Sequence, residues 1–124
     1  MLSALYGAWA ARAGDRKGAL KLLEDGYGAF AHDRFLQILE YRRDRFPEQP
    51  IAGPFFANMG GFLMSLLTGF PRLQIDDGDP QTWASDLVVL PQGWTAIEID
   101  RLFIRGSSMR LVARQGERAQ LTPA

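Results

Sequence analysis

The chain has no cysteine and one histidine among its 124 residues. Without cysteine it has neither a disulfide framework nor a thiolate metal site, and a single histidine, His32, excludes a histidine-rich metal centre. We therefore expect neither a metal ion nor a cofactor. The missing cysteines suit a reducing compartment, and we expect the protein in the cytoplasm.

Net charge and long apolar runs are also missing. Fourteen basic and fourteen acidic side chains cancel, so no overall field attracts nucleic acid or an anionic membrane. The longest apolar run, residues 62–67, is far shorter than the ~20 residues of a membrane-spanning helix. The first residues lack the charged region and cleavage site of a signal peptide. We expect no nucleic-acid partner and no membrane association.

The hydrophobic fraction of 47% is sufficient for one ordinary core. Apolar residues at helical spacing predict a helical hairpin over residues 2–27, in which Gly14 ends the first helix and Asp15 caps the second. No capping residue precedes the first helix. We therefore expect the chain to be the C-terminal part of a larger architecture.

The middle of the chain is less regular. Residues 30–40 suit either a short helix or an extended segment, and residues 41–54 contain three prolines and a glycine, which predicts a loop. Asn58 is then expected to cap a helix over residues 59–68 that ends at Gly69.

The last third is rich in β-branched and aromatic residues between turn-forming runs, which predicts strands. The expected strands are residues 73–75, 86–90, 94–104 and 109–114. Residues 106–108 suit a hairpin turn, and the polar tail after Arg114 is expected to fray. Helices followed by an antiparallel sheet define an α+β fold.

Two adjacent glycines, Gly60 and Gly61, stand in an apolar helical segment, although glycine in a helix costs roughly 1 kcal/mol relative to alanine. At a helix N-terminus, free backbone N–H groups attract phosphate or sugar hydroxyls, and glycine lets such a ligand come close. The alternative is close packing against another element. The spacing alone leaves both interpretations open.

Glu40 ends the run FLQILE and precedes a loop that contains Arg42, Arg43 and Arg45. Its carboxylate is a candidate general base at the rim of a pocket. The alternative is a surface glutamate that pairs with one of these arginines.

Other candidates carry weaker chemical signals. His32 has no identifiable partner and is assigned no role. The aspartates of DDGDP lack the ligand spacing of a calcium loop, which predicts a plain turn. Aromatic residues at helical spacing are typical of a core rather than a sugar platform. This set is Tyr6, Trp9, Tyr27, Phe30 and Phe35.

Four stretches together resemble the C-terminal part of glycoside hydrolase family 65. They are AARAGDRKGALKLLEDGYGAF, FLQILE, FFANMGGFLMSLLTGFPRLQI and LPQGWTAIEIDRLFIRGSSMRLV. The resemblance implies three parts: the end of an (α/α)₆ barrel in residues 1–70, a small antiparallel β-sheet domain in residues 71–116, and a tail in residues 117–124.

The resemblance also implies an inverting enzyme that acts on α-glucosides, with a glucose-containing disaccharide as substrate. Phosphorylases of the family carry a phosphate-binding histidine before the glycine-rich segment, but Phe55 stands at or next to that place here. Hydrolases carry a glutamate that serves as general base, and Glu40 falls on its position. Gly60, Gly61 and Asn58 are then the substrate-binding candidates.

An inverting hydrolase needs two carboxyl groups roughly 6.5–9.5 Å apart. The family's general acid lies upstream of the matched residues, so we expect the chain alone to be catalytically incomplete. The alternatives are a disaccharide phosphorylase fragment and a non-catalytic interaction module with an open apolar face. A truncated barrel should expose such a face, which predicts self-association.

Overall fold

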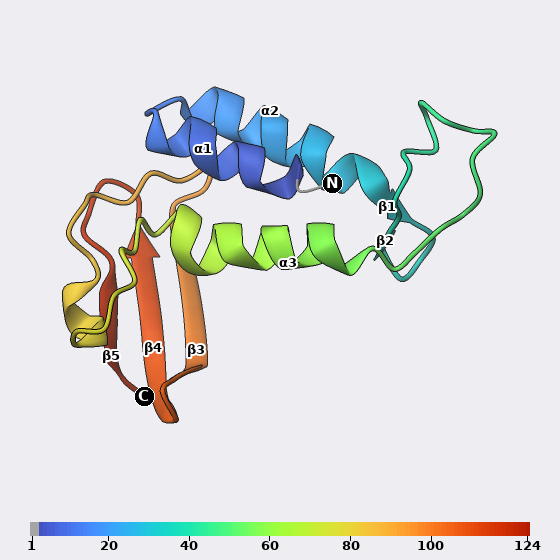
Figure 1. The fold of residues 1–124 in the computed structure, drawn as a ribbon. Coiled ribbons are helices and arrows are strands. Elements are labelled where there is room, and N and C mark those ends of the chain that lie inside the picture. The colour runs from blue at the N-terminus through green and yellow to red at the C-terminus, as the bar shows by residue number, and fades with distance from the viewer. Residues whose placement is uncertain (1–2) are drawn as a thin grey trace.

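The computed structural model describes residues 3–124 (Figure 1). The helices α1, α2 and α3 lie together. The β1–β2 hairpin and the long loop that follows β2 are at one end, and a three-stranded sheet is at the other. The helices span Tyr6–Arg12 (α1), Arg16–Gly26 (α2) and Phe56–Met64 (α3), and the strands span Ala31–His32 (β1), Gln37–Ile38 (β2), Ala96–Ile104 (β3), Ser107–Arg114 (β4) and Gln120–Pro123 (β5). None of the helices in this part of the chain has the length and hydrophobicity that crossing a membrane requires.

The predicted helical hairpin is confirmed. A short 3₁₀ turn, Ser3–Leu5, leads into α1, and Gly14 adopts the left-handed conformation, with φ +84°, where the chain reverses. Asp15 caps α2 as expected, because its side chain accepts a hydrogen bond from the Gly18 N–H at 2.8 Å. Leu2, included in the predicted hairpin, lies outside the described residues.

Residues 30–40 form the extended alternative rather than the helical one. Ala31 pairs with Ile38 and His32 with Gln37, so β1 and β2 make a small antiparallel hairpin. Asp33 and Leu36 in its turn have positive φ angles of 56° and 52°. Such angles are uncommon for residues other than glycine.

The predicted start of the third helix is wrong. The helix α3 begins at Phe56, Phe55 precedes it without a side-chain cap, and Asn58 lies inside its first turn. The reason is tertiary: the Phe55 N–H donates to the Ile38 carbonyl at 2.8 Å, which fixes the chain beside β2 and starts the helix directly afterwards. The helix continues as a π-helical turn over Ser65–Gly69, and Gly69 is the predicted end.

The sheet is antiparallel in the order β3-β4-β5, and Gly106, with φ +82°, lies in the predicted turn between β3 and β4. The expected fraying after Arg114 is wrong, because residues 120–123 form β5. Ala119 and Leu121 are buried, and Leu121 pairs with Leu111. These two apolar side chains fix the tail on the sheet.

Two predicted strands, residues 73–75 and 86–90, do not form. Leu73, Val88 and Leu90 are buried in the core, but their backbone has no strand partner apart from an isolated bridge between Leu87 and Arg118. The apolar composition of these two segments therefore reflects burial in the core and not pairing in a hydrogen-bonded ladder.

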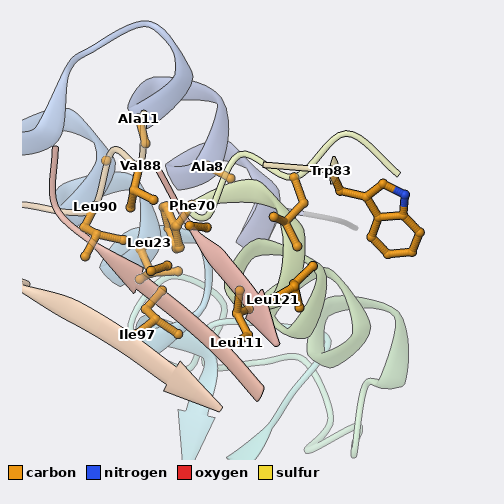
Figure 2. Close-up of a cluster of buried hydrophobic side chains, with 14 of the residues drawn as sticks. Ala8, Ala11, Leu23, Phe70, Trp83, Val88, Leu90, Ile97, Leu111 and Leu121 are labelled. Carbon is orange, nitrogen blue, oxygen red and sulfur yellow. The ribbon is translucent and has the colours of Figure 1, made fainter. Parts of the chain in front are cut away.

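One buried cluster joins the helical hairpin to the sheet (Figure 2). Ala8 and Leu23 come from α1 and α2, Phe70 follows α3, and Ile97 and Leu111 come from β3 and β4. The coarse α+β architecture is therefore as predicted. The division at residue 70 and the barrel origin of the helices stay predictions.

Candidate functional site

The backbone brings Glu40 to the start of α3. Two residues after β2, the Glu40 N–H donates to the Ala52 carbonyl at 2.8 Å, and the Phe55 N–H donates to Ile38. Both ends of the loop over residues 41–51 are thus held beside each other. The sequence-predicted loop is confirmed, and its closed base positions Glu40 next to the segment that leads into α3.

Glu40 lines a hollow of about 370 Å³, a volume in the usual range for small-molecule sites. We call it the Glu40 hollow. Most of its surface is apolar, and its other lining residues are Phe30, Tyr41, Arg42, Phe46 and Gln49. Aromatic side chains beside a carboxylate, a guanidinium and an amide can hold the apolar face of a sugar ring and bind its hydroxyls.

A second hollow of about 280 Å³ adjoins the first, because Phe30, Arg42 and Phe46 line both. It also contains Asp25 and Tyr6. The two hollows together offer more room than a single sugar ring occupies.

The arginines of the loop have partners other than Glu40. Arg42 pairs with Asp44, its Nη2 lying 2.6 Å from the Asp44 carboxylate, and Arg45 approaches the same group at 3.9 Å. Arg43 donates to the carbonyls of Pro47 and Gln49. Within residues 3–124, Glu40 forms no ion pair. The alternative of a glutamate paired with a loop arginine is therefore not what the structure contains.

Two other carboxyl groups lie near the Glu40 hollow. The hydrogen bond from Lys21 holds the pKa of Asp25 below its ordinary value, and the hydrogen bond from Arg42 does the same to the pKa of Asp44. A general acid at neutral pH needs a raised pKa instead. Neither aspartate suits the role of general acid, so the described residues around the hollow supply Glu40 without a matching acid.

The two glycines differ from each other and from the prediction. They are the fifth and sixth residues of α3, beyond the four N-terminal N–H groups that lack an intrahelical partner, so the expected glycine helix start is wrong. Gly60 is exposed, and a methyl group there would meet nothing within 4 Å. Gly61 is buried on the same helix face as Asn58 and Ser65. Gly61 therefore stands at a buried position of the helix, while Gly60 faces open space.

Asn58 holds three segments together. Its side chain is 1% exposed, its Oδ1 accepts from the Ala4 N–H at 2.9 Å, and its Nδ2 donates to the Gly26 carbonyl at 2.9 Å. The side chain of Ser65, about two helical turns further along, donates to the Ala4 carbonyl at 3.1 Å. This geometry gives Asn58 a structural role and leaves neither amide heteroatom pointing into the Glu40 hollow.

Some of the aromatic residues predicted for the core are buried, and others are exposed. Phe30 is buried and Tyr27 stacks on Phe62 with ring centroids 4.1 Å apart, as a core role requires. Tyr6, Trp9 and Phe35 are exposed, so the prediction is wrong for these three. Helical spacing does not distinguish the inner face from the outer face of a hairpin.

The remaining candidates follow the sequence interpretation. His32 is half-buried in β1, and it gains no role. Asp76 accepts hydrogen bonds from the Gly78 N–H and the Trp83 indole, and Asp79 caps the short 3₁₀ helix Pro80–Thr82. These contacts are those of a turn and a helix cap. Residues 3–124 contain no group of three potential metal ligands.

Sequence reasoning missed Tyr41, Phe46 and Gln49, which complete the Glu40 hollow. They stand in a proline-containing loop where no periodicity marks a facing direction. Comparison of the chain with protein-family models, with curated proteins and with solved structures finds no match.

Proposed function

We propose that the chain is part of an inverting α-glucoside hydrolase and that Glu40 is its general base. The observation that carries the proposal is the position of this carboxylate in a hollow of about 370 Å³ with three aromatic side chains. The resemblance to the end of a family 65 (α/α)₆ barrel assigns the base to the same residue. In the proposed site, a glucosyl ring packs against Phe46, and Gln49 binds its hydroxyls.

In the proposed reaction, the Glu40 carboxylate takes a proton from a water molecule as that water attacks the anomeric carbon. The leaving oxygen must receive a proton from a second carboxyl group on the opposite face of the sugar. Asp25 and Asp44 are unsuited because their lowered pKa values keep them ionised. The chain alone should therefore bind a glucoside without hydrolysing it.

The test is a titration of the isotope-labelled chain with kojibiose, trehalose, maltose and nigerose, followed by NMR. Saturable shifts of residues around Glu40 are expected, and Phe46→Ala should weaken them by removing the stacking surface. Glu40→Gln should also weaken them, because it replaces a carboxylate that would accept from the sugar hydroxyls. Glu24→Gln, which changes an exposed glutamate on α2, is its control. Absence of binding to every disaccharide would overturn the proposal, and robust glucose release by the chain alone would refute its catalytic incompleteness.

One observation favours the second candidate, a module that associates through an apolar face. Phe56, Leu63 and Met64 on α3 are all more than half exposed, beside the open position at Gly60. Exposed apolar surface of this kind marks interaction sites. We expect self-association in light scattering at high concentration and a shift toward monomer for Leu63→Glu. A monomeric parent chain under these conditions would count against the module.

A further inference from the structure

The hollow that adjoins the Glu40 hollow is bounded mainly by apolar side chains. It has a volume of about 280 Å³, and its apolar part consists of Tyr6 from α1, Leu22 from α2, Phe30 and Phe46. We call it the Leu22 hollow. Its other lining residues are Ser3, Asp25, Gly26 and Arg42. A cavity of roughly 150 Å³ lined by leucine, isoleucine and phenylalanine already holds benzene, so this hollow has room for an aromatic ring.

Apart from the Tyr6 hydroxyl, the polar groups of this lining have partners within the chain. Ser3 Oγ donates to the Gly26 carbonyl at 2.7 Å, and the same carbonyl accepts from Asn58 Nδ2 at 2.9 Å. Both lone pairs of that oxygen are therefore used. The Asp25 carboxylate forms an ion pair with Lys21, one helical turn before it on α2. These groups offer little to a polar ligand.

The guanidinium of Arg42 lines both hollows and is also occupied. Its Nε and Nη2 donate to the Asp44 carboxylate at 3.0 and 2.6 Å, and its Nη1 lies 3.5 Å from the Asp25 carbonyl oxygen. Phe30 and Phe46 line both hollows as well. A single ligand can therefore extend from one hollow into the other along these two aromatic rings.

The two hollows differ in what they offer to such a ligand. In the Glu40 hollow, the Glu40 carboxylate forms no ion pair within residues 3–124, and the Gln49 side chain adds an amide. These groups can bind the hydroxyls of a sugar. A second sugar ring in the Leu22 hollow would give up water around its hydroxyls and gain few hydrogen bonds in return, which is unfavourable. An aromatic ring there would bury apolar surface alone.

We infer that the Leu22 hollow binds an apolar ring, and that in the proposed enzyme this ring is the aglycone of the substrate. The aglycone assignment rests on the proposed hydrolase function. The substrate class is then an aryl α-glucoside, with its glucosyl ring in the Glu40 hollow and its aryl ring against Tyr6, Leu22 and Phe46. Contacts between aromatic rings add to the gain from burial of their area.

The experiment is an NMR titration of the isotope-labelled full chain with methyl α-glucoside, maltose, phenyl α-glucoside and phenol. Phenyl α-glucoside should bind about tenfold more tightly than methyl α-glucoside, because its ring buries additional apolar surface. Maltose should bind no more tightly than methyl α-glucoside. The side-chain signals of Tyr6 and Leu22 should shift with phenyl α-glucoside and with phenol, and they should not shift with methyl α-glucoside.

Three variants separate the contributions of the two hollows. Leu22→Ala should reduce the preference for the phenyl glucoside to about threefold and leave binding of methyl α-glucoside unchanged, since Leu22 lines only its own hollow. Gln49→Ala, in the Glu40 hollow, should weaken both glucosides by the same factor. Leu87→Ala removes an exposed leucine that lines neither hollow and should change nothing. Tyr6→Ala replaces Leu22→Ala if that variant does not fold.

Three results would overturn the inference: maltose binding as tight as that of phenyl α-glucoside, no response of Tyr6 and Leu22 to phenol, or an unchanged preference in a folded Leu22→Ala variant. Failure of the proposed function gives a different pattern. If no sugar ligand shifts the signals around Glu40 while phenol shifts those of Leu22 in a saturable manner, the hydrolase proposal and the aglycone assignment fail, and the apolar ring site is supported.

Discussion

At the sheet end of the molecule, the inner face of β4 and β5 is buried in the cluster that also contains α1 and α2 side chains, whereas at the other end Phe35, Phe46 and Phe56 are more than half exposed. Leu111 is 0% exposed in the central strand, and Phe56 is 73% exposed at the start of α3. Burial at the sheet end supplies stability. The loop end leaves its aromatic groups and Glu40 available for a ligand or a partner, so the two ends should respond differently to substitution.

The largest expected effect is at the sheet end. Leu111→Ala removes a fully buried side chain from the central strand, and we expect a loss of about 2–5 kcal/mol in the free energy of unfolding. Phe46→Ala, at the half-exposed rim of the Glu40 hollow, should change it by less than roughly 0.5 kcal/mol. Urea denaturation of both variants measures the difference. Equal losses would remove the distinction between the two ends.

The next effect concerns the contact that joins the helices. In Asn58→Ala the Ala4 N–H loses its side-chain acceptor, while the Gly26 carbonyl keeps a hydrogen bond from Ser3 Oγ at 2.7 Å. One buried donor is left unsatisfied, so we expect a loss of about 1–3 kcal/mol.

The matched control for Asn58→Ala is Gln49→Ala, which removes an amide from the rim of the Glu40 hollow. It should leave the denaturation midpoint in place and weaken disaccharide binding. Normal stability together with lost disaccharide binding in Asn58→Ala would instead restore the predicted substrate-binding role of Asn58.

A smaller effect separates the two glycines. Gly60→Ala adds a methyl group in open space inside a helix, so it should stabilise the chain by about 0.5–1 kcal/mol. Gly61→Ala adds the same group at a buried position and should destabilise it. Thermal unfolding followed by circular dichroism compares the two. If Gly60→Ala abolishes disaccharide binding without loss of stability, Gly60 contacts the ligand and is not merely a solvent-exposed position of the helix.

Local patterns predicted much of the fold. Asp15 as a cap, the loop over residues 41–54 and the hairpin at Gly106 follow from residue chemistry that acts over a few positions. The start of α3 does not, because a hydrogen bond from Phe55 to Ile38, seventeen positions away, decides it. Residues 86–90 show the same limit, since an apolar segment that is buried in the core has the same composition as a strand.

The candidate site shows a similar division. Glu40 was predicted from its place at the end of FLQILE and from the family resemblance, whereas Phe46 and Gln49 reach the same hollow only through the folding of the loop.

The smallest expected effect tests the loop end by pH. The Arg42 hydrogen bond lowers the pKa of Asp44 in the folded chain below the ordinary value of 3.8, so the folded state favours the ionised carboxylate. The associated stability is present above pH 3.8 and is lost as the pH falls through the folded-state pKa. Because the pair is exposed, its contribution should be small. Asp44→Asn should therefore slightly flatten the fall in stability at acid pH, measured as urea midpoints from neutral pH downward.

Glu48→Gln, which removes an exposed loop carboxylate with no ion pair in residues 3–124, is the control. A large loss of stability in Asp44→Asn would mean that the loop end contributes to the fold as the sheet end does.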